Sequence, residues 1–229
     1  LFRSSAASDV YKRQLILTPH YNHSDLVIKA LNKGKAVYVE KPLALNMQSI
    51  TDIEESIYRS ENPKLFIGFN RRFSKSAQFI KQKLIDSSAN SINIRFSVPP
   101  LDSDHWTNIK EIGGGRIVGE AVHGIDLACY LFDSLPQSIS ASAPIDKTNN
   151  MVKDNQVFLN INFANGSHAS LQYFSEANQI LSKERVEVHG EGNSYILEDF
   201  RMLRFLEGSQ DRSKTFSSGK GHKESLSIF

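Results

Sequence analysis

The chain has 229 residues, 40% of them hydrophobic and 23% charged, and its 27 basic and 25 acidic residues give a net charge of +2. At roughly 150 residues per domain, this length fits one large domain or two small ones, and either can fold without disulfides. The mixed charges argue against a strongly electrostatic nucleic-acid or membrane binder, and no apolar run approaches the ~20 residues of a membrane helix. The single cysteine, Cys129, is typical of the reducing cytoplasm, where we expect the protein to be located.

The two ends of the chain lack the organisation of the residues between them. Residues 1–14 show neither strand alternation nor a helical apolar stripe, so we expect a non-native or disordered leader, with a native arm as the alternative. Residues 223–229 begin an amphipathic pattern that stops within its second turn, which is too short for a helix that is stable alone. We therefore interpret the chain as a fragment of a longer protein, truncated in its last domain.

The first organised part of the chain predicts alternating strands and helices. Three short apolar runs have the near-continuous hydrophobicity of buried strands, and two amphipathic helices are predicted between them. The expected strands are 15–17, 36–39 and 65–69, and the helices begin at the caps Ser24 and Asn46. This order predicts a parallel sheet that is covered on both faces.

The chain from Phe73 onward predicts a different organisation. A helix over 73–89 comes first, after which alternating strands dominate, and Asn165-Gly166 is the strongest hairpin signal. The expected strands lie within 91–98, 157–163, 169–173, 186–188 and 195–197, a further helix runs from Gly119 to Phe132, and a polar surface loop covers 146–154. This part is predicted to be a mostly antiparallel α+β domain.

Two polar segments follow predicted strands, at the edge of the sheet where open α/β folds bind ligands. They are Thr18-Pro19-His20 and Glu40-Lys41-Pro42. Lys41 could hydrogen-bond a substrate hydroxyl and favour its deprotonation, although a solvated loop cation is an equally good interpretation of its position. His20 and His23 have no further ligands at zinc spacing, so we expect no metal.

A glycine run before a predicted helix is the second candidate site. Residues 113–115 are three consecutive glycines, which allow the backbone to approach a neighbour closely. Glu120, His123 and Asp126 follow at steps of three, which places them along one helical face. A carboxylate beside an imidazole fixes its tautomer and raises its basicity, so the pattern favours proton transfer over a purely structural histidine.

Two other glycine-containing segments are not nucleotide-binding motifs. Residues 190–192 begin like a dinucleotide fingerprint, but they join two predicted strands and therefore predict a hairpin turn. Residues 217–221 lack the leading glycine of a P-loop and its strand–helix context. The complete phosphate-binding fingerprint is absent from the sequence.

Several motifs occur in the order that one enzyme family shows. Thr18-Pro19 with His23, Glu40-Lys41-Pro42, residues 70–73 and the glycine run that leads to His123 and Asp126 together resemble the glucose–fructose oxidoreductase/inositol dehydrogenase (Gfo/Idh/MocA) family. Residues 104–106, 113–123, 173–176 and 183–188 are most similar to the bi-domain members, which are fused to a zinc-type alcohol dehydrogenase module. The resemblance covers the chain from Leu15 to its end.

The resemblance implies an architecture and a reaction. The family pairs a Rossmann domain with an open-sheet α/β domain and transfers hydride between NAD(P) and a sugar-like alcohol. Residues 15–72 would be the C-terminal part of an incomplete Rossmann domain, and residues 73–229 would be the substrate and dimerisation domain. We therefore expect NAD or NADP as cofactor, a sugar, nucleotide sugar or cyclitol as substrate, and a homo-oligomer formed through the open sheet.

The resemblance also implies roles for individual residues. His123 would be the general acid/base, and Lys41 would lie between nicotinamide and substrate. Either Glu120 would be a third catalytic residue that replaces the family's usual acid, or Lys41 and His123 would act without a carboxylate. The residues expected to line the cofactor cleft are Thr18, Pro19, His23, Glu40, Lys41 and Pro42. The residues expected to contact the substrate are Asn70, Arg72, His105, Trp106 and Asp126.

The sequence departs from the family pattern at two points. Many members carry an aspartate four residues before the histidine, where this chain has Gly119 and Glu120 follows. The first βαβ unit, whose helix N-terminus would bind the pyrophosphate, is also missing, so we expect this chain alone to bind dinucleotide weakly or not at all. The alternative hypothesis is a non-catalytic binding or dimerisation module on the same fold.

Overall fold

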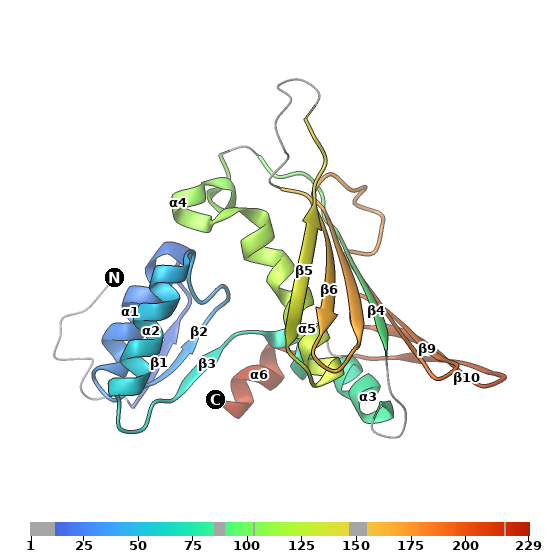
Figure 1. Ribbon diagram of the computed structural model, residues 1–229, viewed down its shortest axis with the longest axis horizontal. Coiled ribbons are helices and arrows are strands. Elements are labelled where there is room, and N and C mark those ends of the chain that lie inside the picture. Colours follow the sequence, from blue (N-terminus) through green and yellow to red (C-terminus); the bar gives the residue numbers. More distant parts are fainter. Residues whose placement is uncertain (1–11, 85–89, 103, 147–154, 218) are drawn as a thin grey trace. The chain divides into compact units, whose positions relative to one another are not determined.

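The computed structural model describes residues 12–84, 90–102, 104–146, 155–217 and 219–229 (Figure 1). The chain divides into two compact units. The first unit consists of Leu1–Phe69, Trp106–Gly114 and Phe229, and the second consists of Asn70–His105 and Gly115–Ile228. Most of the predicted leader, the end of the helix predicted over 73–89 and most of the loop predicted over 146–154 lie outside the described residues.

The first unit is built on a three-stranded parallel sheet. Its strand order is β1-β2-β3, and each neighbouring pair runs parallel. The strands are β1 (Arg13–Ile16), β2 (Ala36–Val39) and β3 (Leu65–Ile67), and the helices are α1 (His23–Leu31), α2 (Met47–Arg59) and the short α4 (Lys110–Gly113). A compact apolar core joins the sheet to α1 and α2; its buried members are Ile16, Val27, Ala30, Leu31, Val37, Val39 and Ile53.

Two element boundaries in this unit differ from the predicted ones. Strand β1 begins at Arg13 because Arg13 and Gln14 pair with Ala36 and Val37 through their backbones, which requires no apolar side chain. The assignment of these two residues to a disordered leader is therefore wrong. Ser24 is not an N-cap, since α1 already begins at His23. The cap predicted for α2 is confirmed, because the Asn46 side chain accepts a hydrogen bond from the Ser49 amide at 2.9 Å.

The second unit contains an eight-stranded sheet with the order β11-β10-β9-β8-β4-β7-β6-β5. Among the described strands of this sheet, β4 and β7 form the one parallel pair, and the other neighbours are antiparallel. The strands are β4 (Ser91–Ser97), β5 (Pro136–Ser142), β6 (Val157–Phe163), β7 (His168–Phe174), β8 (Glu184–Gly190), β9 (Asn193–Glu198), β10 (Met202–Glu207) and β11 (Gln210–Thr215). The predicted fold class, a small parallel sheet followed by a mostly antiparallel one, is confirmed.

Helices cover one face of this sheet. Figure 1 shows α3 (Lys75–Lys83) and α5 (Val122–Phe132) on that face, and a further helix, α6 (His222–Ile228), ends the unit. Helix α5 approaches β4 and β7 so closely that a Cβ atom at Gly124 would lie 2.4 Å from Leu171 Cδ1 and 2.9 Å from Phe96 Cε2. The glycine therefore sets how near the helix can lie to the strands.

The predicted elements of this unit are partly revised. The hairpins around 165–166 and 190–193 are confirmed as β6–β7 and β8–β9. The helix predicted from Gly119 begins as a π-helical turn, Ile117–Ala121, and becomes α-helical at Val122. Strands β5, β10 and β11 were not predicted; every residue of β11 is exposed, so it has no buried face to produce an alternating pattern. No helix among the described residues is long and apolar enough to cross a membrane.

Candidate active site

The carboxyl ends of β1 and β2 carry the segments predicted to hold a cofactor. His23, fully buried at the start of α1, connects them: its Nδ1 lies 2.7 Å from the Pro42 carbonyl oxygen and its Nε2 lies 2.9 Å from the Thr18 carbonyl oxygen. His23 therefore connects the segment after β1, which includes Pro19, to the segment Glu40-Lys41-Pro42 after β2. The hydroxyl oxygen of Thr18 is buried and has no hydrogen-bond partner among the described residues.

The glycine run begins in the same unit and packs against the chain itself. His20 Nδ1 lies 2.7 Å from the Gly113 carbonyl oxygen, and the His20 ring meets the Trp106 ring edge-on with centroids 4.8 Å apart. A Cβ atom at Gly113 would lie 2.4 Å from Thr107 Cα. The first glycine of the run is thus required by its close packing on residues 106–107. Of the two predicted substrate contacts in this region, Trp106 belongs to the first unit and His105 belongs to the second.

In the second unit, His123 is buried on α5 and its Nε2 lies 2.7 Å from Nη1 of Arg71. An arginine can only donate hydrogen bonds, so Nε2 of His123 accepts and the neutral ring carries its proton on Nδ1. Arg71 in turn forms a two-bond ion pair with Glu184, with 3.1 Å from Nε to Oε2 and 2.9 Å from Nη2 to Oε1. The Glu184 carboxylate thus influences His123 indirectly, by holding the Arg71 guanidinium that bonds to the ring.

Residues near the C-terminus complete this network. The Lys220 ammonium contacts the same Glu184 oxygen as Arg71 does. The Asn70 amide nitrogen donates to the Lys220 carbonyl at 2.7 Å and lies 3.1 Å from Nε2 of His222, while its oxygen accepts from Arg71 at 2.9 Å. We call Asn70, Arg71, His123, Glu184, Lys220 and His222 the His123 network.

The close fit of the network depends on Gly221. This residue adopts a φ of +83°, and a Cβ atom there would lie 2.4 Å from the Asn70 carbonyl oxygen and 2.5 Å from the Ser74 amide nitrogen. Both the left-handed backbone and the lack of space favour glycine. The segment around Gly221 can therefore reach the turn that carries Asn70 and Arg71.

Neighbouring positive charges keep the buried Glu184 carboxyl group ionised. Burial alone would raise the pKa of Glu184, but the charge and hydrogen bonds of Arg71, followed by those of Lys220, outweigh burial and lower this pKa below its ordinary value. Arg71 therefore stays paired with a carboxylate, and its Nη1 group is directed to Asn70 and His123.

The three polar residues predicted to share one helical face each meet a different cation. Glu120, on the π-helical turn, lies 3.7 Å from the Lys183 ammonium. Asp126 forms an ion pair with Arg72, in which Nε lies 3.0 Å from Oδ2. Burial raises the pKa of Asp126, and the hydrogen bond and charge of Arg72 oppose part of that rise. Cations from other segments therefore line this face of the helix.

The structure brings some predicted site residues together through residues that were not predicted. Asn70 and His123 are joined by Arg71, and Arg72 and Asp126 contact each other directly. The unpredicted members of the network are Arg71, Glu184, Lys220 and His222. A sequence signal did exist for Glu184, because it occupies the inward-facing register of β8 together with Val186 and Val188, and a charged residue in such a register indicates a buried ion pair.

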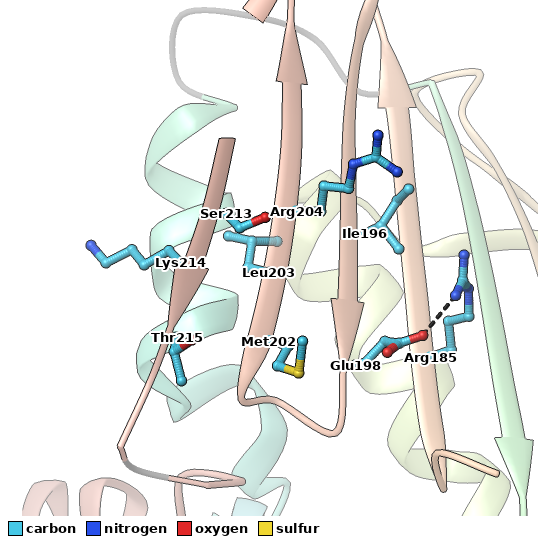
Figure 2. A pocket seen from close by; sticks show the side chains of 9 residues that line it. All are labelled: Arg185, Ile196, Glu198, Met202, Leu203, Arg204, Ser213, Lys214 and Thr215. Carbon is cyan, nitrogen blue, oxygen red and sulfur yellow. Dashed lines mark hydrogen bonds and ion pairs between the residues drawn. The ribbon is translucent and has the colours of Figure 1, made fainter. Parts of the chain in front are cut away.

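A shallow pocket on the outer part of the sheet is a weaker candidate. Figure 2 shows it between β8, β9, β10 and β11, with Arg185 paired to Glu198 at 2.7 Å. Its lining residues are Arg185, Ile196, Glu198, Met202, Leu203, Arg204, Ser213, Lys214 and Thr215. None of these belongs to the His123 network, and the described residues nowhere group three His, Cys, Asp or Glu side chains as a metal site would.

Comparisons with known proteins match both halves of the chain. The oxidoreductase family with an NAD-binding Rossmann fold matches residues 7–69, and the GFO/IDH/MocA C-terminal domain matches residues 88–196. Inositol 2-dehydrogenase from Rhizobium meliloti is 28% identical over 205 residues, which cover 86% of this chain and 59% of that protein. The chain therefore spans less than two thirds of the length of this relative.

Solved structures with low sequence identity share the fold. A dehydrogenase from Clostridium difficile matches with a TM-score of 0.79 at 21% identity, over 99% of this chain and 72% of that chain. A levoglucosan dehydrogenase in complex with NADH and levoglucosan matches with a TM-score of 0.76 at 23% identity, over 92% and 62% of the two chains. With family matches on both halves, the chain belongs to the Gfo/Idh/MocA family of oxidoreductases.

Proposed function

We propose that a protein containing this chain transfers hydride between NAD(P) and a sugar, nucleotide-sugar or cyclitol-type alcohol. The observation that carries the proposal is the buried His123, whose tautomer is fixed by Arg71 and, through it, by Glu184. A histidine whose tautomer is set by a hydrogen bond keeps one defined nitrogen for proton transfer, as acid–base catalysis requires, and Nε2 becomes that nitrogen once the Arg71 hydrogen bond opens. The names of the relatives, inositol 2-dehydrogenase and levoglucosan dehydrogenase, support the class of substrate.

The first unit fits the proposed cofactor. The buried Thr18 hydroxyl, which has no hydrogen-bond partner in the described part of the chain, lies just after a parallel strand, where dinucleotides bind in open α/β sheets. When bound, NAD(P) supplies the nicotinamide that accepts or returns the hydride. The residues proposed to hold it are Thr18, Pro19, His23, Glu40, Lys41 and Pro42.

The remaining steps of the proposed reaction belong to side chains of this chain. Lys41 hydrogen-bonds the reacting hydroxyl, and its positive charge favours loss of the hydroxyl proton. His123 accepts that proton at Nε2, which requires the Arg71 N–H to leave this nitrogen. Glu120 is proposed to assist, and Asn70, Arg72, His105, Trp106 and Asp126 are proposed to orient the sugar.

Turnover measurements test this proposal. A protein containing the chain is incubated with NAD⁺ or NADP⁺ and with myo-inositol, levoglucosan or other sugars, and formation of reduced nicotinamide is followed by absorbance. We expect turnover of at least one polyol, abolished or strongly reduced in Lys41→Ala. No reduction of cofactor with any substrate would favour the alternative, a non-catalytic binding or dimerisation module on the same fold.

Several finer parts of the sequence interpretation remain predictions. These are the domain limit at 72/73, fusion to a zinc-type alcohol dehydrogenase module, a cytoplasmic location and a homo-oligomer formed through the open sheet. Polar side chains on the outer face of the sheet, among them Asn93 and Gln172, suit an interface that is hydrated in part. Mass measurement of the protein in solution tests the oligomer.

A further inference from the structure

Arg116 is a buried arginine whose bonded partners are all neutral. The residue is only 7% exposed, at the start of the π-helical turn that leads to His123. Its Nε donates to the Tyr173 hydroxyl at 3.1 Å, and its Nη1 donates to the Pro99 carbonyl at 3.0 Å. Its guanidinium carbon also lies 5.7 Å from the centroid of the Tyr173 ring. None of these groups carries a compensating negative charge.

No carboxylate in the described part of the chain lies within ion-pair distance of Arg116. The two acids that act electrostatically on its neighbour Tyr173 are engaged elsewhere, since Glu120 pairs with Lys183 and Glu184 pairs with Arg71. Buried charges in proteins are almost always paired, because an isolated ion in the interior is strongly unfavourable. The Nη2 group of Arg116 also donates to none of the described residues.

A second observation, at the end of the adjoining strand β7, also indicates a site for a ligand. Ser175 follows β7 in the same inward-facing register as Leu171 and Tyr173. Its side chain is 1% exposed, and its hydroxyl has no hydrogen-bond partner among the described residues. An unsatisfied hydroxyl at such a depth costs free energy unless a ligand or water bonds to it.

The chemistry of these groups defines what they can bind. Burial raises the pKa of Tyr173 to about 12, against the opposing charge of Arg116, so its hydroxyl keeps its proton at neutral pH. That oxygen accepts a hydrogen bond from Arg116, which leaves its own O–H to donate. Arg116, Tyr173 and Ser175 therefore offer a fixed positive charge and hydroxyl donors.

We propose that Arg116, Tyr173 and Ser175 form a subsite for an anionic group of the substrate, a carboxylate or a phosphate, so that the proposed reaction acts on an acidic sugar. The inference rests on the proposed function only in treating the anion as part of the substrate. Arg116 directly precedes the π-helical turn that runs into α5, the helix that carries His123, so the subsite and the proposed acid/base belong to one continuous segment of the second unit.

Binding measurements without cofactor test the subsite. The chain is titrated calorimetrically with D-glucuronate, D-glucose 6-phosphate and neutral D-glucose. Hydrogen bonds to charged groups predict that one of the two anions binds about tenfold to hundredfold more tightly than glucose. Preference for glucuronate would assign a carboxylate, and preference for glucose 6-phosphate would assign a phosphate.

Variants separate a binding role from a structural one. Arg116→Gln should remove the preference for the anion, and Arg116→Lys should keep part of it. The matched control is Arg185→Gln, because Arg185 already pairs with Glu187 and Glu198 and should leave the preference unchanged. If Arg116→Gln fails to fold, Ser175→Ala takes its place and should weaken anion binding severalfold.

Three outcomes would overturn the inference: equal affinities for glucose and both anions, no binding of either anion, or an anion preference that survives Arg116→Gln. Because these measurements need no NAD(P), their failure is distinct from that of the proposed function. Arg116-dependent anion binding without turnover would contradict only the redox reaction. Turnover of sugars with no Arg116-dependent discrimination would contradict only the subsite.

Discussion

Arg71 and Glu184 form a two-bond ion pair in the interior of the second unit, although 113 positions separate them in the chain. The pair joins the turn before α3 to the first residue of β8, and Arg71 also reaches Nε2 of His123. A buried ion pair adds little stability relative to apolar residues of the same shape, but breaking one is costly. We therefore interpret this pair as a device that positions His123.

Removal of the Glu184 carboxylate should destabilise the protein strongly. Glu184→Ala leaves Arg71 buried without a counter-charge, so we expect the free energy of unfolding to fall by about 3–5 kcal/mol. Urea denaturation measures the loss. The control is Glu198→Ala, which breaks the half-exposed pair with Arg185 and should cost at most about 1 kcal/mol. Similar losses in both variants would contradict the buried ion pair.

The lowered pKa of Glu184 predicts how its contribution depends on pH. The unfolded chain, with a pKa near 4.5, binds the proton of this carboxyl more readily than the folded protein does. Stability from Glu184 is therefore fully present above that value and is lost as the pH falls through the folded pKa. Denaturation midpoints measured across this range should fall less steeply with acid in Glu184→Gln than in the unmodified protein.

Asp126 should show the opposite dependence. Burial raises its folded pKa above the unfolded value of 3.8, so the folded protein holds this proton more tightly. Its contribution is most favourable below 3.8 and decreases as the pH rises through the folded pKa. In Asp126→Asn the stability should decline less with rising pH over that window. An unchanged slope, measured by denaturation at several pH values, would show that Asp126 titrates normally.

The packing of α5 predicts the effect of one added methyl group. Gly124→Ala places a Cβ atom against Leu171 and Phe96 at distances that force the helix and the sheet apart, so we expect a loss of about 1–3 kcal/mol. Gly219→Ala is the matched control, since a Cβ atom there meets nothing within 4 Å. Thermal unfolding compares the two variants, and equal midpoints would contradict the close approach.

Acid–base chemistry at His123 predicts a kinetic effect. In a protein that contains this chain and is active, His123→Ala should lower turnover by roughly 10²–10⁴-fold, the usual contribution of a positioned acid or base. His189→Ala is the control, because His189 lies on β8 outside the network and is partly exposed. Turnover that is unaffected by the loss of His123 would remove this residue from the mechanism.

The sequence predicts the first unit well because its signals are local. Apolar runs form β2 and β3, and Asn46 caps α2 as its side-chain chemistry favours. Strands β5 and β11 could not be found in this way, since they consist mainly of small or charged residues paired at or near a sheet edge, where backbone hydrogen bonds suffice.

The residues of the candidate site also fall into those with a local sequence signal and those without one. His123 and Asp126 were predictable from their spacing on one helix, whereas Arg71, Lys220 and His222 were not, because their partners are far away in the sequence. An arginine followed by another arginine usually indicates a solvated surface. The burial of Arg71 and the partial exposure of Arg72 become evident only in the folded structure.

The position of β4 between β7 and β8 has a consequence for synthesis of the protein. Asn93 and Ser170, which are hydrogen-bonded across β4 and β7, lie 77 positions apart. A nascent chain therefore exposes the central strand long before either neighbour leaves the ribosome. Because such distant pairings close large loops, we expect assembly of this sheet to be late and slow, and β4 to need shielding until then.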